Sequence, residues 1–322
     1  MSRAASKYLA IDPPGSATPL NSEKRSMQWS AAVILILCVL FCAEGKAGSQ
    51  PQPNGAVLVG AADIARCDRR QSEQTARLLD DIGGMVFTAG DHAYPHGTAQ
   101  EFIECYGLTW GRHRSRTRPA PGNHDYDSPG AKPYFKYFGD NAGPAGRGYY
   151  SYELGSWHIV SLNSNRAAES WGAVQEQWLR ADLQASHSNC VAAYWHHPRF
   201  SSGSKYGDHP YMTALYKILY QRGVSLLISG HDHIYERFAA QDPEGKADPG
   251  GVRQFVVGTG GGRLYSIGKI KPNSETRNTV AHGVLKLTLY PSHYDWEFVP
   301  VKGQSFHDRG TASCSARQHV SK

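Results

Sequence analysis

Residues 85–94 of this 322-residue chain read MVFTAGDHAY, an apolar run followed by a glycine and then by acidic, imidazole and phenol side chains. The run 85–89 has the length and composition of a buried β-strand. Asp91 and Tyr94 come directly after it, where the strand is expected to end. Because a rigid sheet fixes the positions of the loops at its strand ends, this stretch predicts functional side chains on an α/β scaffold.

Four further stretches place polar side chains after an apolar or turn-like run: Asp63 after AVLVGAA, Gly122-Asn123-His124-Asp125, Trp195-His196-His197-Pro198 and Gly230-His231-Asp232-His233. Any one such residue is more often a turn residue or a helix cap than a ligand. Together they offer carboxylate, phenol, amide and imidazole groups, which suit hard ferric iron and divalent zinc, iron or manganese. The ordered set therefore predicts a site for two adjacent metal ions, with the candidate ligands Asp63, Asp91, Tyr94, Asn123, His196, His231 and His233.

The pattern of apolar residues predicts a single α/β domain over residues 56–315. Strands are expected at 56–62, 85–89, 148–153, 157–162, 191–195, 224–229, 254–257, 283–289 and 294–300. Helices are expected at 71–82, at 98–106 and between 171 and 183, where the apolar residues at helical spacing are Trp171, Val174, Trp178, Leu179 and Leu183. Strands that alternate with helices imply sheets with both faces covered. The strand-rich last third suggests a second sheet packed on the first.

The order and spacing of the five motifs resemble the calcineurin-like metallophosphoesterase superfamily, and within it the purple acid phosphatases. That signature runs D, GDxxY, GNH(D/E), xxxH and GHxH, here from about Val57 to His233. The resemblance implies a four-layer αββα sandwich of two mixed sheets flanked by helices. The first motif departs from it, because Ala62 and Ala65 stand where glycines are common. No histidine lies two residues after Asp63, and Tyr94 as a compensating donor favours the tyrosine-ligated subgroup.

The resemblance also implies roles for single residues. The first metal would be bound by Asp63, Tyr94 and His233, the second by Asn123, His196 and His231, and Asp91 would bridge them. The implied pair is Fe(III) with Fe(II), Zn or Mn. His124 resembles the catalytic histidine beside the leaving group, His209 resembles a further substrate-facing histidine, and Asp125 is expected to orient His124. Two adjacent ions could activate water for in-line attack at phosphorus while His124 protonates the departing oxygen.

The sequence therefore predicts a metal-dependent phosphomonoesterase of acid-phosphatase type that acts on small-molecule phosphate esters. A phosphodiesterase or nucleotidase on the same site is the alternative enzyme. A non-catalytic metal-binding module is the alternative from another class, and the presence of His124 argues against it. The net charge of +6 is mild and no dense Lys/Arg stripe occurs, so nucleic-acid binding is not expected.

The N-terminus has the features of an export signal. Lys24 and Arg25 precede the apolar run 31–43, which small residues follow. That run is shorter than the ~20 residues of a transmembrane helix, so a stable membrane span is not expected, although an uncleaved anchor is the alternative. We expect an export signal with an N-terminal extension over 1–47, a linker over 48–55 and a tail over 316–322.

Four of the six cysteines, Cys67, Cys105, Cys190 and Cys314, lie beyond this signal. An even number in an exported chain predicts two disulfides, with three possible connectivities. We favour the pairing Cys67–Cys105 with Cys190–Cys314. A thiolate zinc site is disfavoured because no CxxC spacing occurs.

Overall fold

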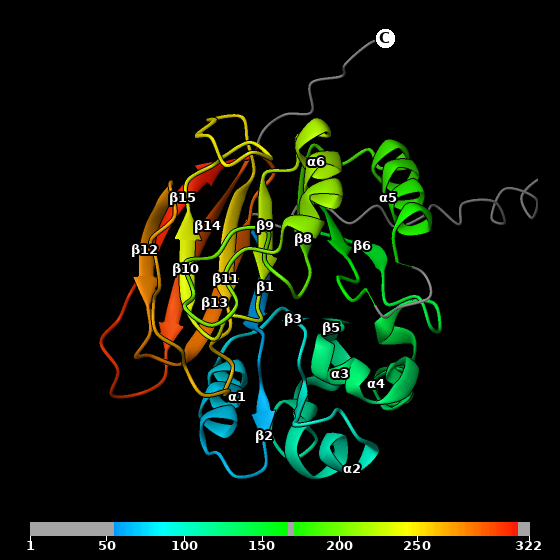
Figure 1. Ribbon diagram of the computed structural model, residues 1–322, viewed down its shortest axis with the longest axis vertical. Helices are drawn as coiled ribbons and strands as arrows, with labels where there is room; N and C mark the ends of the chain where they lie inside the picture. The colour runs from blue at the N-terminus through cyan, green and yellow to red at the C-terminus, as the bar shows by residue number, and fades with distance from the viewer. Residues whose placement is uncertain (1–54, 167–170, 315–322) are drawn as a thin grey trace, which may run out of the picture. The chain divides into compact units, whose positions relative to one another are not determined.

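The computed structural model describes residues 55–166 and 171–314 (Figure 1). The expected export signal over 1–47, the linker up to residue 54 and the tail over 316–322 lie outside these residues, so those boundaries stay predictions. No helix among the described residues is long and apolar enough to cross a membrane.

Six strands form the first sheet. Their order is β15 (Arg309–Ser313), β14 (His293–Pro300), β13 (Gly283–Leu289), β1 (Ala56–Ala61), β3 (Met85–Ala89) and β5 (Thr117–Ala120). The strands β1, β3 and β5 are parallel to one another, whereas β13, β14 and β15 continue the sheet in antiparallel register. The carboxyl ends of the three parallel strands therefore meet at one edge.

Seven strands form the second sheet. Their order is β12 (Ser274–Asn278), β10 (Tyr235–Phe238), β11 (Arg253–Val257), β9 (Leu226–Ser229), β8 (Cys190–Tyr194), β7 (Trp157–Ser161) and β6 (Tyr150–Leu154). The four central strands β11, β9, β8 and β7 are parallel. Both large sheets are thus mixed, as predicted.

The two sheets pack face to face through aromatic side chains. Phe87 of β3 lies 5.9 Å from Tyr194 of β8 between ring centroids, and Trp157 of β7 lies 5.6 Å from Tyr294 of β14. Such tilted and edge-to-face pairs contribute beyond the area that they bury. The interface fixes the distance between the strand ends of the two sheets.

Helices cover the outer faces. Along β8, Ala192 and Tyr194 face the first sheet, while Val191 and Ala193 pack against α5 (Ala173–Ala185) and α6 (Thr213–Gln221). This period of two is that of a strand buried on both faces. The helix α1 (Gln71–Asp81) lies beside β13 of the first sheet. The four-layer αββα sandwich is confirmed.

Shorter elements surround the strand ends. The helical ones are α2 (Ala99–Glu101), a π-turn (Phe102–Tyr106), α3 (Asn123–Asp127), α4 (Lys132–Phe138) and 3₁₀ turns at Trp110–Arg116, Pro129–Ala131, Gly139–Ala142 and Pro210–Met212. The two-residue strands β2 (Ala65–Arg66) and β4 (Ala93–Tyr94) pair in parallel beside the first sheet.

Three expectations are corrected. The strands of the last third do not make a separate sheet, because β11 and β12 join the second sheet and β13 to β15 join the first. Val174 is not on the buried face of α5: it is 62% exposed, and Gln175 lies under the helix with Leu179 and Leu183. The segment 98–106 is not one α-helix, because it passes from α2 into a π-turn.

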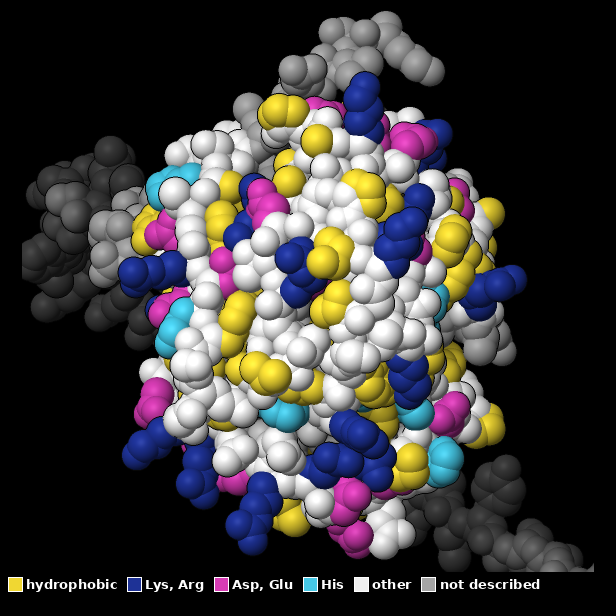
Figure 2. Space-filling model, turned by 60° about the vertical axis from the view of Figure 1, so that its left-hand side comes forward, with side chains coloured by type: hydrophobic (Ala, Val, Ile, Leu, Met, Phe, Trp, Pro, Cys, Tyr) yellow, Lys and Arg dark blue, Asp and Glu magenta, His cyan; other side chains and the backbone are white. Residues whose placement is uncertain are grey.

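Both expected disulfides are present. Cys67 pairs with Cys105, which ties the segment after β2 to the π-turn. Cys190 at the start of β8 pairs with Cys314 just after β15, so the second bridge links the two sheets. On the face drawn in Figure 2, Lys and Arg side chains lie interspersed with Asp and Glu rather than in one stripe.

Candidate metal centre

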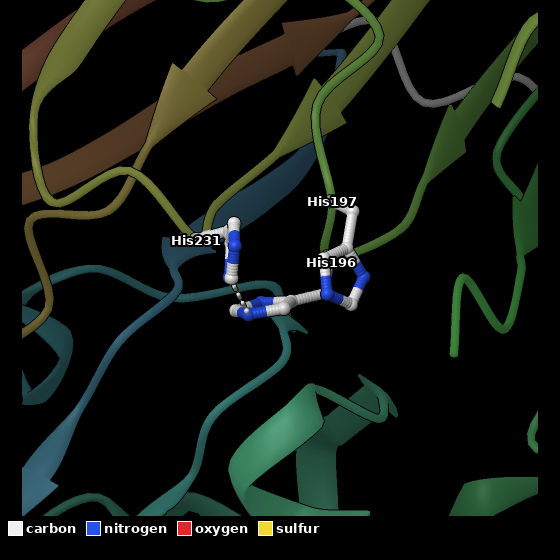
Figure 3. A group of neighbouring side chains, drawn as sticks. All are labelled: His196, His197 and His231. Carbon is white, nitrogen blue, oxygen red and sulfur yellow. Dashed lines mark hydrogen bonds between the residues drawn. The ribbon is translucent and has the colours of Figure 1, made fainter. Parts of the chain in front are cut away.

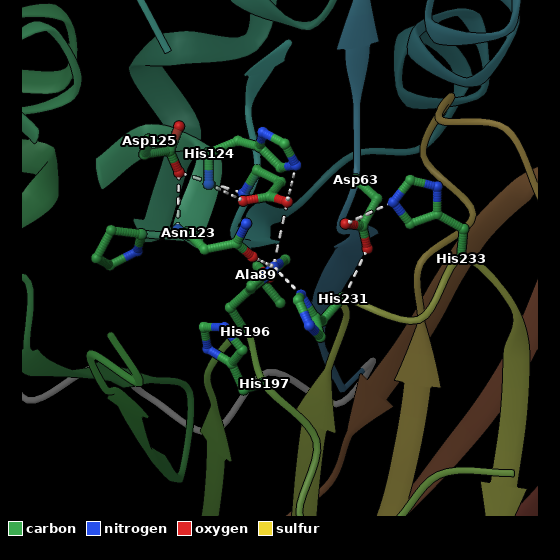
Figure 4. Close-up of polar contacts among 12 residues, drawn as sticks. Asp63, Ala89, Asn123, His124, Asp125, His196, His197, His231 and His233 are labelled. Atoms are coloured by element: carbon green, nitrogen blue, oxygen red, sulfur yellow. Dashed lines mark hydrogen bonds and ion pairs between the residues drawn. The ribbon is translucent and has the colours of Figure 1, made fainter. Parts of the chain in front are cut away.

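The loops that follow parallel strands of both sheets meet at one place. Asp63 N–H donates to Gly90 O at 3.1 Å, and Gly230 N–H donates to His196 O at 2.9 Å. Ala62 N–H donates across the sheets to Val257 O at 2.9 Å. Backbone bonds therefore hold the motifs against one another, and the side chains on them point into a shared space (Figure 4).

One group of side chains gathers around Tyr94. Its hydroxyl donates to Asp63 Oδ1 at 2.8 Å and lies 3.1 Å from His233 Nε2. His233 Nε2 is also 3.2 Å from Asp63 Oδ1. The other ring nitrogen of His233 lies 2.8 Å from the carbonyl oxygen of Arg263, which orients the imidazole and leaves Nε2 facing the group.

A second group gathers around His196. Its Nε2 atom lies 3.1 Å from Asn123 Oδ1 and 3.2 Å from His231 Nδ1. The Nδ1 atom of His196 is 2.8 Å from the carbonyl oxygen of Ala89, so the ring is held with Nε2 toward the partners. A backbone carbonyl on the far nitrogen of a histidine is the usual arrangement when that histidine binds a metal.

Asp91 belongs to both groups. Its Oδ2 atom accepts a hydrogen bond from Tyr94 at 3.0 Å and lies 3.3 Å from His196 Nε2. Its Oδ1 atom accepts from the backbone N–H of His124 at 2.9 Å. All seven predicted metal-ligand residues are thus brought together, in two groups of three that share the Asp91 carboxylate.

The backbone at these residues is unusual. Five non-glycine residues in the described segments have a positive φ, and three of them are Asp63, Asp91 and His231, at 61°, 54° and 69°. Left-handed backbone is uncommon outside glycine and concentrates at functional sites. It turns each of these side chains sharply from its strand end toward the centre.

Glycines leave room for close approach. A Cβ at Gly122 would lie 2.1 Å from Asp91 Oδ1, and one at Gly90, where φ is +91°, would lie 2.5 Å from His196 Nδ1. A Cβ at Gly230 would lie 2.2 Å from the Cβ of Ala62, so the glycine leaves the space that this alanine occupies. Alanine at position 62 is therefore accommodated, and Asp63 keeps its place despite the altered first motif.

The electrostatics of the group suit a cation. Burial lowers the pKa of His196, but the charge and hydrogen bond of Asp91 outweigh this effect and raise it to about 9. Burial, followed by the charges of Asp63 and Asp91, raises the pKa of Tyr94 well above its ordinary value. Two buried carboxylates thus attract whatever positive charge is present, and the donor set fits metal ions.

His124 lies at the edge of this cluster and is not among the buried groups. Its Nε2 atom is 3.9 Å from Asp91 Oδ2, and its ring is 4.6 Å from that of Tyr94. Its Nδ1 atom contacts the carbonyl oxygen of Pro95 at 2.5 Å and Asp127 Oδ2 at 3.2 Å. With 29% of the side chain exposed, Nε2 faces the cluster from the solvent side.

The expectation that Asp125 orients His124 is corrected by these contacts. The buried Asp125 carboxylate accepts from the backbone N–H groups of Asp91, His92 and Gly122 at 3.2, 3.3 and 2.8 Å. It also contacts His92 Nδ1 at 2.9 Å. Asp127, three residues after His124 on α3, takes the orienting position instead, as the i,i+3 spacing of a helix allows.

Further histidines lie beside the second group. His197 was not among the predicted ligands, yet it lies close to His196 and His231 and the three could together hold an ion (Figure 3). Its Nδ1 atom is 2.8 Å from Ser164 Oγ. The ring of His209 lies 4.8 Å from that of His231, and its buried Nε2 atom has no hydrogen-bond partner among the described residues.

The part of the chain that carries the five motifs is similar in sequence to a known family. Residues 60–235, more than half of the chain, match the sequence profile of calcineurin-like phosphoesterases. The chain belongs to that family. All five motifs of the candidate centre lie inside the matched region.

Within the calcineurin-like phosphoesterases, the chain is similar to plant purple acid phosphatases. It is 30% identical over 256 residues to purple acid phosphatase 21 of Arabidopsis thaliana, covering 71% of this chain and 58% of the relative. It is also 30% identical to purple acid phosphatase 15 of the same plant, covering 60% of this chain and 42% of the relative. The chain thus spans about half the length of the curated relatives it matches.

The fold is shared with a solved purple acid phosphatase from yellow lupin (Lupinus luteus) seeds. The two superpose with a TM-score of 0.67 over 82% of this chain and 55% of the lupin chain, at 18% identity. At that identity the likeness concerns the fold alone.

Proposed function

We propose that this chain is a metal-dependent hydrolase of phosphate esters, a two-metal phosphomonoesterase of purple acid phosphatase type. The observation that carries the proposal is the position of Asp91 Oδ2, which contacts Tyr94 in one group of donors and His196 in the other. A shared carboxylate between two sets of donors is the arrangement that a pair of adjacent cations needs.

The donors favour different ions in the two groups. Asp63, Tyr94, His233 and the shared Asp91 would hold the first ion, and the phenol oxygen favours hard Fe(III). Asn123, His196, His231 and Asp91 would hold the second, where imidazole and amide groups suit divalent iron, zinc or manganese. Because burial and two carboxylates raise the pKa of Tyr94, its ionisation requires the positive charge of a bound ion.

The chain's own residues account for the proton and the orientation of the substrate. When bound, the metal ions supply Lewis-acid charge at the phosphoryl group and lower the pKa of water. His124 Nε2 faces the cluster and would hold the proton that the leaving oxygen takes up. Pro95 O and Asp127 fix Nδ1, so the imidazole keeps that direction. His209, with its buried and unpartnered Nε2 atom, would face the substrate.

We also propose that the protein is exported, as its N-terminal sequence predicts. The two disulfides support this proposal, because such bonds persist in oxidising compartments. The apolar run 31–43 on which the export signal depends lies outside the described residues.

Activity assays with defined metals test the proposed function. The purified protein, loaded with iron and then with zinc or manganese, is expected to release p-nitrophenol from p-nitrophenyl phosphate. If Tyr94 binds ferric iron, the loaded protein should be coloured by phenolate-to-iron charge transfer, and Tyr94→Phe should remove the colour. Turnover confined to bis(p-nitrophenyl) phosphate would favour the phosphodiesterase alternative. No turnover of either ester by metal-loaded protein would favour a non-catalytic module.

A further inference from the structure

Two tyrosines and a lysine cover the His231-x-His233 pair from the outside. The ring of Tyr206 stacks on that of His231, with centroids 4.0 Å apart and an interplanar angle of 27°. The ring of Tyr265 stacks on that of His233 at 4.2 Å and 11°. Neither tyrosine belongs to a motif that predicts chemistry, so only the fold brings them to the site.

Lys205 connects the two tyrosines. Its Nζ atom lies 4.7 Å from the ring centroid of Tyr206 and 4.5 Å from that of Tyr265, both within the range of cation–π attraction. It also donates a hydrogen bond to Tyr265 Oη at 2.8 Å. An exposed lysine is usually mobile, but these three contacts hold the ammonium group in one place.

The fixed position is close to the candidate metal centre. Tyr265 Oη lies 3.5 Å from His233 Nε2, the nitrogen that faces Asp63 and Tyr94. Because Tyr265 Oη accepts its hydrogen bond from Lys205, its own proton is free to point to another acceptor. Lys205 and Tyr265 therefore present an ammonium group and a hydroxyl proton beside the first group of donors.

The loop that carries Lys205 is anchored by a residue of the same histidine motif. Asp232 is buried and is the residue between His231 and His233 in the sequence. It accepts hydrogen bonds from Tyr206 N–H at 3.2 Å and Gly207 N–H at 2.9 Å. The loop also pairs with the segment after Tyr265, where Ser204 N–H donates to Ser266 O at 3.0 Å. These hydrogen bonds hold the loop of Lys205 beside the two histidines.

We propose that Lys205, supported by Tyr265, binds a terminal oxygen of the substrate phosphate and makes the site selective for dianionic monoesters over monoanionic diesters. This inference rests on the proposed phosphoesterase function and names its substrate class. A monoester carries a second charged oxygen that a fixed ammonium group can neutralise, whereas a diester carries a neutral substituent there. The ammonium group of Lys205 positions the substrate phosphate and discriminates between the two ester classes, and His124 remains the proton donor.

The test compares Lys205→Met with Lys269→Met, which removes a neighbouring exposed charge from the paired segment. With metal-loaded protein, Lys205→Met should weaken inorganic phosphate binding by about 10- to 100-fold, the usual effect of losing one charge-assisted hydrogen bond. It should lower kcat/KM for p-nitrophenyl phosphate by a similar factor. The kcat/KM for bis(p-nitrophenyl) phosphate should stay nearly unchanged. Lys269→Met should change neither the phosphate affinity nor the kcat/KM for either ester. Lys205→Arg should restore part of the monoester preference that Lys205→Met loses.

Metal content and the unfolding midpoint are measured for each variant, so that a misfolded loop is recognised. Equal losses on both esters with unchanged metal content would overturn the proposal, as would unchanged phosphate affinity. If the wild-type protein hydrolyses neither ester, the phosphoesterase function fails. In that case, phosphate binding by wild type and by Lys205→Met is compared by isothermal titration calorimetry. This comparison still decides whether Lys205 recognises phosphate.

Discussion

Asp91 Oδ2 lies 3.3 Å from His196 Nε2, and this contact joins the ends of the two sheets. Asp91 follows β3 of the first sheet, whereas His196 follows β8 of the second. The donor set therefore exists only when the sandwich is assembled. Ions that bind this set and not the unfolded chain should stabilise the fold in proportion to the logarithm of their concentration.

Replacing His124 by Ala should lower turnover without releasing metal, because its ring stands outside the two groups of donors. The loss is expected to be about 10²- to 10⁴-fold on alkyl phosphates, the usual contribution of general acid catalysis, and smaller on nitrophenyl esters with good leaving groups. Steady-state kinetics on both classes measure it, and His307→Ala serves as an exposed control. Equal losses on the two classes would contradict the proton-donor role.

Asp125 and Asp127 provide a matched pair of substitutions. Asp125→Asn should destabilise the protein by about 2–3 kcal/mol, because the buried carboxylate accepts three backbone hydrogen bonds and contacts His92. Asp127→Asn should leave stability nearly unchanged, since its side chain is 44% exposed, but should reduce turnover through His124. Urea unfolding and kinetics separate the two. The reverse result would restore Asp125 as the residue that orients His124.

Much of this architecture is predictable from the sequence because the buried parallel strands are continuous apolar runs. The strands β3 and β13 have their predicted bounds, and β1 agrees within one residue. The motifs that contain Asp63, Asp91, His196 and His231 follow such strands, namely β1, β3, β8 and β9, so the positions of these candidate ligands follow from the same pattern. The gathering of those ligands into two groups follows from the resemblance and not from the spacing alone.

Other elements carry no such signal. The strand β5 contains Pro119, which argues against a strand by composition, and it is tolerated because β5 lies at the edge of its sheet. The strands β12 and β15 are short, polar and partly exposed, so they lack apolar alternation. Contacts made by single side chains, such as Lys205 with Tyr265, depend on loop pairing that no local pattern encodes.

Removing either disulfide should destabilise the protein by about 2–4 kcal/mol, chiefly because each bridge restricts the unfolded chain. Cys67–Cys105 closes a separation of 38 residues and Cys190–Cys314 one of 124, so the second is expected to matter more. The paired variants Cys67→Ser/Cys105→Ser and Cys190→Ser/Cys314→Ser are compared by urea unfolding. Non-reducing peptide mapping checks the pairing, and a Cys67–Cys190 peptide would contradict it.

His158 should make stability depend on pH. Its ring contacts Asp182 at 2.8 Å and Glu153 at 2.6 Å; burial opposes its protonation, but these two carboxylates outweigh burial and raise its pKa. The stabilisation is therefore complete below the unfolded pKa of about 6.5 and disappears as pH rises through the folded value. Without metal, wild type should have a higher unfolding midpoint than His158→Gln. The difference between the two midpoints should be larger at about pH 6 than at about pH 9. A difference that grows with pH would refute this assignment.

The metal content of wild type and of Asp91→Ala, measured by mass spectrometry after identical reconstitution, tests the central claim most directly. If Asp91 serves both groups of donors, wild type should hold about two ions per chain. Asp91→Ala should retain little of either ion and should lose its phosphatase activity, while His307→Ala, altered at an exposed histidine, should match wild type. One ion or none in fully reconstituted wild type, or two ions retained by Asp91→Ala, would contradict a dinuclear centre shared through Asp91.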